Sequence, residues 1–192
     1  MAPGSSTESG YHPWRETLLE TAWASIRHGL EYGRALSLDP ADYPEPLQRP
    51  GACFVTLERF GQLRGCIGTL EAWRPLIEDV AENAYAAAFR DPRFPPLSHE
   101  ELEGLELEIS ILGSPEPIQF SSETELLRQL EPGVDGLILE ERGHRGTFLP
   151  TVWQSLPEPR EFLRQLKRKA GLPPDYWSPT VRVWRYRTEL IR

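Results

Sequence analysis

The chain has 192 residues, of which 39% are hydrophobic and 26% are charged, and its formal net charge at neutral pH is −8. A chain of this length and composition can bury one substantial core or two small ones. The negative charge argues against a general binder of nucleic acid or anionic membranes, and no apolar run approaches the length of a membrane span. Two cysteines are too few for a disulfide framework, so we expect a reducing, cytoplasmic setting.

The chain begins with a segment that has no apolar pattern. Residues 1–10 are rich in Ser, Gly and Thr and are expected to form a disordered tail before a folded part over residues 11–192. Apolar residues at helical spacing predict a helix over residues 12–36. The prolines within residues 39–50 then predict a linker that is not helical.

A hairpin is predicted next, with strands over residues 52–57 and 62–68. Gly61 ends the connecting loop, which is typical of a three-residue loop with a left-handed glycine and a bulge. In that register Cys66 lies opposite Phe54 rather than opposite Cys53. We therefore expect no disulfide between the two cysteines.

The remainder of the chain interleaves helices and hairpins without a regular strand–helix–strand repeat. Apolar spacing and end signals predict helices over residues 75–90, 122–130 and 159–170. Alternating apolar residues and glycine turns predict strands over residues 105–111, 136–141, 145–149 and 180–187. The predicted class is therefore α+β, with antiparallel sheets flanked by helices.

The most informative stretch is Leu63-Arg64-Gly65-Cys66-Ile67-Gly68. Because side chains alternate along a strand, Arg64 and Cys66 are expected to share one face. A guanidinium beside a thiol favours the thiolate, which is the nucleophilic form. Gly65 and Gly68 leave room for another backbone or a ligand to come close. The alternative is structural: a small core cysteine and an arginine that reaches a carboxylate.

The same hexapeptide resembles the signature of the AMMECR family, and further segments resemble that family in the same order. They are residues 51–57, 88–97, 108–112, 133–136, 145–150 and 169–172. The resemblance runs from about Tyr11 to the C-terminus, and it implies that residues 11–192 form an AMMECR-type domain. One departure is Lys167 and Arg168, which stand where many microbial relatives carry a cysteine.

The resemblance also implies an architecture and partners. It implies two unequal α+β lobes, the smaller one formed by an internal segment, with the signature strand facing the cleft between them. It further implies a frequent genomic association with a Memo-like protein and a radical-SAM protein, the other members of the AmmeMemoRadiSam system, which are the expected protein partners. It assigns no reaction.

Charged residues within the resembling segments are further candidates for substrate binding. Arg64, Arg93 and Arg145 can recognise a carboxylate or phosphate through their guanidinium forks. Asp91 and Asp135 can hold these arginines in place. The alternative is a set of internal Arg–Asp pairs that tie the lobes together.

Two functions from different classes remain open, so whether the chain is an enzyme is not decided by its sequence. In the first, an enzyme acts on a protein or RNA substrate in the inter-lobe cleft and uses Cys66 as nucleophile or covalent anchor. His99 and His144 are the candidate bases, but both are distant in sequence. In the second, a non-catalytic module docks a Memo-like or radical-SAM protein. No metal or cofactor is expected, because the chain lacks Cys-x-x-Cys, His-x-x-x-His and Gly-rich phosphate motifs.

Overall fold

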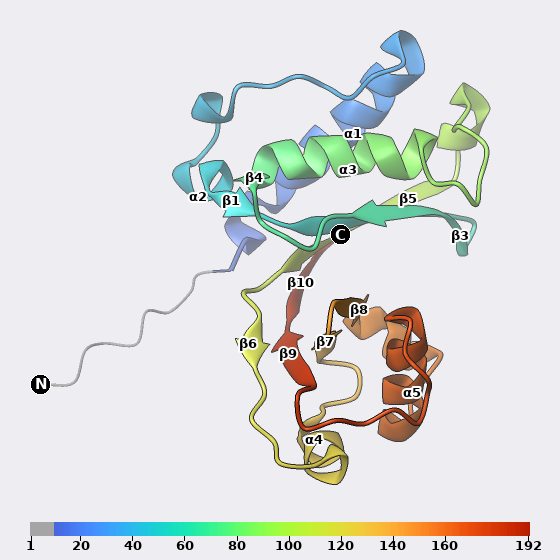
Figure 1. The fold of residues 1–192 in the computed structure, drawn as a ribbon. Coiled ribbons are helices and arrows are strands. Elements are labelled where there is room, and N and C mark those ends of the chain that lie inside the picture. Colours follow the sequence, from blue (N-terminus) through green and yellow to red (C-terminus); the bar gives the residue numbers. More distant parts are fainter. Residues whose placement is uncertain (1–9) are drawn as a thin grey trace, which may run out of the picture. The chain divides into compact units, whose positions relative to one another are not determined.

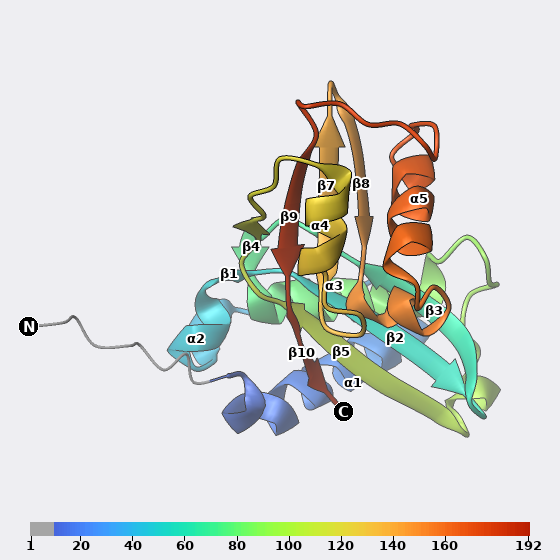
Figure 2. The same cartoon turned by 90° about the horizontal axis from the view of Figure 1, so that it is seen from below.

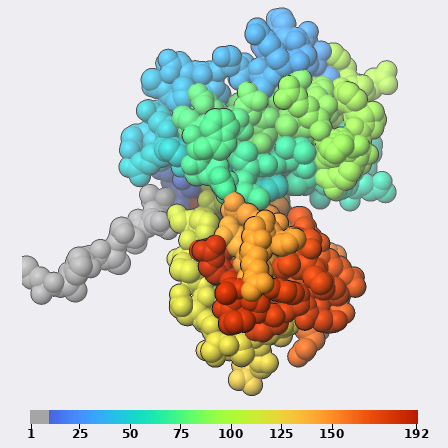
Figure 3. All heavy atoms as spheres, viewed as in Figure 1, coloured from blue at the N-terminus to red at the C-terminus, as the bar shows by residue number. Residues whose placement is uncertain are grey.

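The structure, a computed structural model, describes residues 10–192 (Figure 1). The chain divides into two units (Figures 1 and 3), and each is described by itself. The first unit runs to Leu112 and takes in Glu189–Arg192, while the second consists of Gly113–Thr188. The expected disordered tail lies outside the described residues, apart from Gly10.

The first unit packs helices against a four-stranded antiparallel sheet of order β10-β5-β2-β3, with a separate pair β1-β4. Figure 2 shows β10, β5 and β2 side by side. The helices are α1 (Arg15–Tyr32), α2 (Glu45–Gln48) and α3 (Leu76–Phe89). The strands are β1 (Pro50–Gly51), β2 (Cys53–Arg59), β3 (Gln62–Gly68), β4 (Arg74–Pro75), β5 (Leu105–Leu112) and β10 (Thr188–Ile191).

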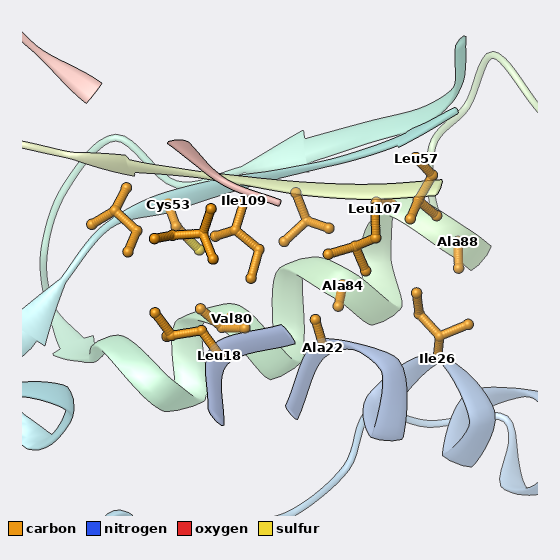
Figure 4. Close-up of a cluster of buried hydrophobic side chains, with 14 of the residues drawn as sticks. Leu18, Ala22, Ile26, Cys53, Leu57, Val80, Ala84, Ala88, Leu107 and Ile109 are labelled. Carbon is orange, nitrogen blue, oxygen red and sulfur yellow. The ribbon is translucent and has the colours of Figure 1, made fainter. Parts of the chain in front are cut away.

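The core of the first unit follows from the period-two pattern of its strands. Figure 4 shows Cys53 and Leu57 of β2 and Ile109 of β5 pointing from the sheet towards α1 and α3. Both helices present small residues to one another and to the sheet, which permits close approach. A Cβ added to Gly29 of α1, for example, would lie 2.4 Å from the ring of Phe89. Helices α1 and α3 therefore pack against each other at short range.

The second unit is a smaller α+β layer with sheet order β6-β9-β7-β8. Trp153 and Phe162 stack with 3.7 Å between ring centroids, and Leu166 is fully buried beside them in the same core. The helices are α4 (Glu123–Gln129) and α5 (Pro159–Lys169). The strands are β6 (Glu116–Pro117), β7 (Gly136–Glu141), β8 (His144–Phe148) and β9 (Arg182–Tyr186).

These elements confirm the predicted α+β class with antiparallel sheets, and most predicted helices and strands agree to within a few residues. Two predictions were wrong in the first unit. The first helix stops at Tyr32 because Gly33 adopts a left-handed cap with φ 68°. The linker over residues 39–50 contains the helical turn α2, because its proline stands in the first turn, where no N–H is needed.

The register of the β2–β3 hairpin also differs from the prediction. Arg59 pairs with Gln62, so the turn holds only Phe60 and Gly61, both with positive φ. The backbone N–H of Phe60 donates to the carbonyl of Gly104 at 3.3 Å, and this tertiary contact holds an aromatic residue in an unfavourable conformation.

The observed register changes the pairing partner of Cys66 but does not place it opposite Cys53. Cys66 pairs with Thr56 rather than with Phe54. Because Thr56 is three residues from Cys53 on β2, the two thiols lie on opposite faces of the sheet. Both cysteines are free.

Candidate functional site

A bulge in β3 decides which face each signature residue occupies. Leu57 of β2 pairs with Gly65 and Glu58 pairs with Leu63, so Arg64 is an extra residue on β3. The bulge breaks the simple alternation. Spacing along β3 alone therefore does not place Arg64 and Cys66 on one face.

Arg64 is bound to the chain segment that follows α3. Its Nε and Nη2 donate to Oε1 and Oε2 of Glu101 at 2.7 and 2.8 Å, and Nη2 also donates to the carbonyl of Pro95 at 2.9 Å. The pair lowers the pKa of Glu101 to about 2 and raises the pKa of Arg64. Nη1 is buried with no hydrogen-bond partner among the described residues. Arg64 thus reaches a carboxylate, as the structural alternative expects.

Cys66 is half-buried on the face of the sheet that is turned away from α3. The hydroxyl of Thr56 donates to its Sγ at 3.3 Å. Its backbone N–H donates to Oδ2 of Asp91 at 2.9 Å. The side chain and the backbone of Cys66 are therefore each fixed by a hydrogen bond, one on β2 and one on the segment after α3.

Asp91 and Arg93 form a second arginine–carboxylate pair beside Cys66. Nε and Nη2 of Arg93 donate to Oδ1 and Oδ2 of Asp91 at 3.0 and 2.7 Å. The bonds from Arg93, followed by the backbone bond from Cys66, hold the pKa of the buried Asp91 carboxyl well below its usual value. The Arg93 side chain is 54% exposed. Its pKa is raised, chiefly by Asp91 and to a lesser degree by the charge of Cys66. Arg93 and the backbone N–H of Cys66 thus share the carboxylate of Asp91.

Other groups of the same unit occupy the space beside each of the two signature glycines. A Cβ on Gly65 would lie 2.1 Å from the carbonyl oxygen of Ala87 on α3. A Cβ on Gly68 would lie 2.3 Å from the ring of Phe54. The space left by each glycine is occupied by the backbone of a helix in one case and by an aromatic ring in the other.

Asp135 and Arg145 belong to the second unit and are engaged there. Oδ2 of the fully buried Asp135 accepts from the backbone of Glu131 at 2.9 Å, and the guanidinium of Arg185 lies 3.5 Å away. Arg145 pairs with Glu140 at 3.4 Å. The structure thus brings Cys66, Asp91 and Arg93 together in the first unit and pairs Asp135 and Arg145 with neighbours of their own.

Sequence reasoning missed Thr56 and Glu101. Thr56 had no signal before the register was known, since only the pairing places it over Cys66. Glu101 follows Ser98 at capping-box spacing, and the box is formed in the structure. That spacing was a readable signal that a carboxylate lies at the start of a helical turn.

A buried polar network beside β2 gives Cys53 an environment that differs from that of Cys66. The carboxylate of Asp79 accepts from the backbone of Cys53 at 2.9 Å, from Thr69 at 2.6 Å and from Asn83 at 2.9 Å. Burial, followed by the charge of Asp79, raises the pKa of the Cys53 thiol well above its usual value. Cys53 is therefore held as an unreactive thiol.

Within residues 10–192, no group of three or more His, Cys, Asp and Glu side chains is placed to hold a metal ion. None of the helices in that range is long and apolar enough to cross a membrane. The chemistry available at the candidate site is that of a thiol, a hydroxyl and an exposed guanidinium.

Fold and site together define an α+β protein with antiparallel sheets in two units and a thiol on an edge strand. The family model described as AMMECR1 matches residues 19–191. A protein of Methanothermobacter thermautotrophicus is 41% identical over 181 residues, which cover 91% of this chain and 92% of that protein. Protein MJ0810 of Methanocaldococcus jannaschii is 41% identical over 157 residues, or 78% of this chain and 76% of that protein. The chain belongs to the AMMECR1 family, as the sequence resemblance predicts.

A solved structure shares the fold. The crystal structure of the uncharacterised protein PH0010 from Pyrococcus horikoshii superposes with a TM-score of 0.82 at 36% sequence identity. The match covers 93% of this chain and 90% of that chain. The α+β architecture is therefore that of a family member known from crystallography.

Proposed function

We propose that the chain is an enzyme of the AMMECR1 family that acts on a protein substrate, with Cys66 as its nucleophile. The observation that carries the proposal is the environment of Sγ. The half-buried thiol accepts a hydrogen bond from the Thr56 hydroxyl, and the backbone of Cys66 shares the Asp91 carboxylate with the exposed guanidinium of Arg93. A polar, cationic and partly exposed setting of this kind is typical of nucleophilic cysteines.

The roles of the neighbouring residues follow from their contacts. Arg93 is held in place by the buried Asp91 and keeps about half of its side chain exposed, so it can contact an anionic group of the substrate. Asp91 positions both Arg93 and the backbone of Cys66. In the reaction, the thiol proton passes to solvent and the sulfur bonds to an electrophilic carbon. The substrate's leaving group departs with the electron pair of the bond that breaks.

The charge of the surrounding sheet favours a protein over RNA as the substrate. Glu58 and Glu106 pair across β2 and β5 on the same face as Thr56 and Cys66, and both are exposed. Carboxylates at this position repel a phosphate backbone and attract basic segments of a polypeptide.

Alkylation by iodoacetamide tests the nucleophile, with Cys53 as an internal control. We expect Cys66 to react several-fold faster at pH 7 than a cysteine in an unstructured peptide, and Cys53 to remain unmodified, as read by peptide mass spectrometry. Arg93→Gln and Thr56→Val should each slow the reaction of Cys66. Arg15→Gln, an exposed arginine on α1, should not. If Cys66 reacts no faster than the peptide cysteine, or Arg93→Gln leaves its rate unchanged, the proposal fails.

A second function is favoured by one observation. Among residues 10–192, no histidine forms a hydrogen bond with Cys66, so neither candidate base of the sequence, His99 or His144, is bonded to the thiol. On this alternative the chain is a docking module for a Memo-like or radical-SAM protein, with Arg93 as the contact. Calorimetry with a purified Memo-like protein separates the two, because docking tolerates Cys66→Ala and is weakened by Arg93→Glu.

A further inference from the structure

A hollow of about 300 Å³ opens on the first unit beside β4 and the first half of α3. Its walls include Leu36 and Leu38 from the segment after α1, Trp73 and Arg74 from the connection between β3 and α3, and Glu78 and Glu82 from α3. It shares no residue with the group around Cys66.

Trp73 forms the aromatic wall of the hollow and packs against an anchored arginine. Trp73 is 69% exposed, and the guanidinium of Arg74 lies 4.8 Å from its ring centroid. Nε of Arg74 donates to the fully buried Asp79 at 2.8 Å, and Asp79 also accepts from Asn83. The indole is therefore backed by an anchored side chain, and most of its surface is free for a ligand.

The aliphatic wall is also anchored. The backbone N–H of Leu36 donates to Oγ of Ser25 at 3.1 Å, and that hydroxyl donates to the carbonyl of Ala81 on α3 at 2.7 Å. Leu38 packs against the hydrophobic core. The segment that lines the hollow is thus tied to both α1 and α3.

The charge inside the hollow is negative. Arg74 is paired with Asp79, so these two charges cancel. Glu78 and Glu82 lie one helical turn apart on α3 and are half-buried, and their carboxylates form no hydrogen bond or ion pair with any residue of the described part of the chain. Two carboxylates without partners therefore face a cavity that has apolar and aromatic walls.

From this combination we infer that the hollow binds a lysine or arginine side chain of a polypeptide partner. The cationic head pairs with Glu78 and Glu82. The alkyl stem lies along Leu36 and Leu38, as long basic side chains do on apolar surfaces. The free face of Trp73 adds a cation–π contact. The exposed indole at the rim provides contact area beyond the head group, and tryptophan in that position is typical of protein interfaces.

The test uses short capped peptides, Ac-Ala-Ala-X-Ala-Ala-amide, with X as lysine, arginine or norleucine. Binding is followed by two-dimensional ¹H–¹⁵N NMR, with the indole signal of Trp73 assigned from Trp73→Phe. We expect the lysine or arginine peptide to shift the Trp73 indole and the amides of Leu36, Glu78 and Glu82 in a saturable way. The norleucine peptide should leave them unchanged.

A matched pair of variants separates the hollow from general charge attraction. The double change E78Q/E82Q should weaken binding about tenfold, since two ion pairs are lost. The change E16Q/E20Q removes the same charge at the same spacing from the exposed face of α1 and should leave affinity unchanged. Trp73→Ala, at an exposed position, should weaken binding about fivefold.

Three results would overturn the inference: no shift of Trp73 with either basic peptide, equal weakening by the two double variants, or tighter binding of free spermidine than of the peptides. Spermidine carries the same ammonium chemistry without a polypeptide, so its preference would assign the hollow to a small amine. Cys66→Ala should leave peptide binding unchanged, which keeps this test independent of the function proposed for the thiol.

Discussion

The two arginines near the signature strand differ in what their guanidinium groups contact. Arg64 has 9% of its side chain exposed and binds Glu101 through two nitrogens, so its charge joins β3 to the segment after α3. Arg93 is 54% exposed and is held from one side by Asp91, so its charge remains accessible. The buried Arg64 therefore has a structural role, whereas the exposed Arg93 belongs to the candidate site.

The Arg64–Glu101 pair predicts a pH-dependent contribution to stability. Glu101→Gln leaves the buried guanidinium without its counter-charge and should lower the free energy of unfolding by about 1–3 kcal/mol at neutral pH. The pKa of Glu101 is lowered to about 2 in the folded protein, and its unfolded value is near the ordinary one of about 4.3. The contribution is therefore complete above about pH 5 and is lost as pH falls towards 2.

Urea unfolding at several pH values measures this effect. The difference between the native protein and Glu101→Gln should be largest near pH 7 and should shrink between about pH 5 and pH 2. Glu103→Gln, at an exposed position two residues away, should cost less than about 0.5 kcal/mol at any of these pH values. A difference that stayed constant with pH would show that the ion pair does not carry the stability.

At the scale of elements, the signature strand is fixed by how closely α3 crosses it. Gly65 sits directly beneath the backbone carbonyl of Ala87, and the alanines of α3 let the helix come this near. The strand can therefore carry the Cys66 thiol on one face only because the other face bears almost no side-chain volume at this point.

Gly65→Ala tests this close approach. A Cβ 2.1 Å from a carbonyl oxygen cannot be accommodated without separating helix and strand, so unfolding stability should fall by about 3 kcal/mol or more. Gly33→Ala is the matched control, because its Cβ would meet open space and only its φ of 68° is unfavourable, at a cost of about 1 kcal/mol. Equal losses in chemical denaturation would mean that α3 can yield at Gly65.

The elements also show what a single sequence can and cannot predict. Apolar periodicity identified α3 and β5, because their buried faces repeat with the period of the backbone. The β2–β3 register was mispredicted because the contact of Phe60 with Gly104 joins residues far apart in the chain. Local turn preference carries no information about such a contact. The bulge at Arg64 shifts the register by one further residue, and with it the partner of Cys66.

At the scale of the whole molecule, the chain builds two separate hydrophobic clusters. Ile109 belongs to the cluster of the first unit and Leu166 to that of the second, and no residue is common to both. The candidate site residues follow this division, with Cys66, Asp91 and Arg93 in one unit and Asp135 and Arg145 in the other. Sequence segments with a shared family resemblance therefore identify residues worth testing, but the fold decides which of them can act together.

Because the two units have separate cores, a destabilising substitution in one unit is expected to leave the other unit folded. Leu166→Ala removes a fully buried side chain of α5 and should cost the second unit about 2–5 kcal/mol. Hydrogen exchange read by mass spectrometry should then show lost protection in β7, β9 and α5, while β2, β5 and α3 keep theirs. Ile109→Ala, equally buried, should give the reverse pattern. If either change exposed both sets of amides to the same extent, the two clusters would be one cooperative unit, because only shared unfolding can carry a loss of protection from one core to the other.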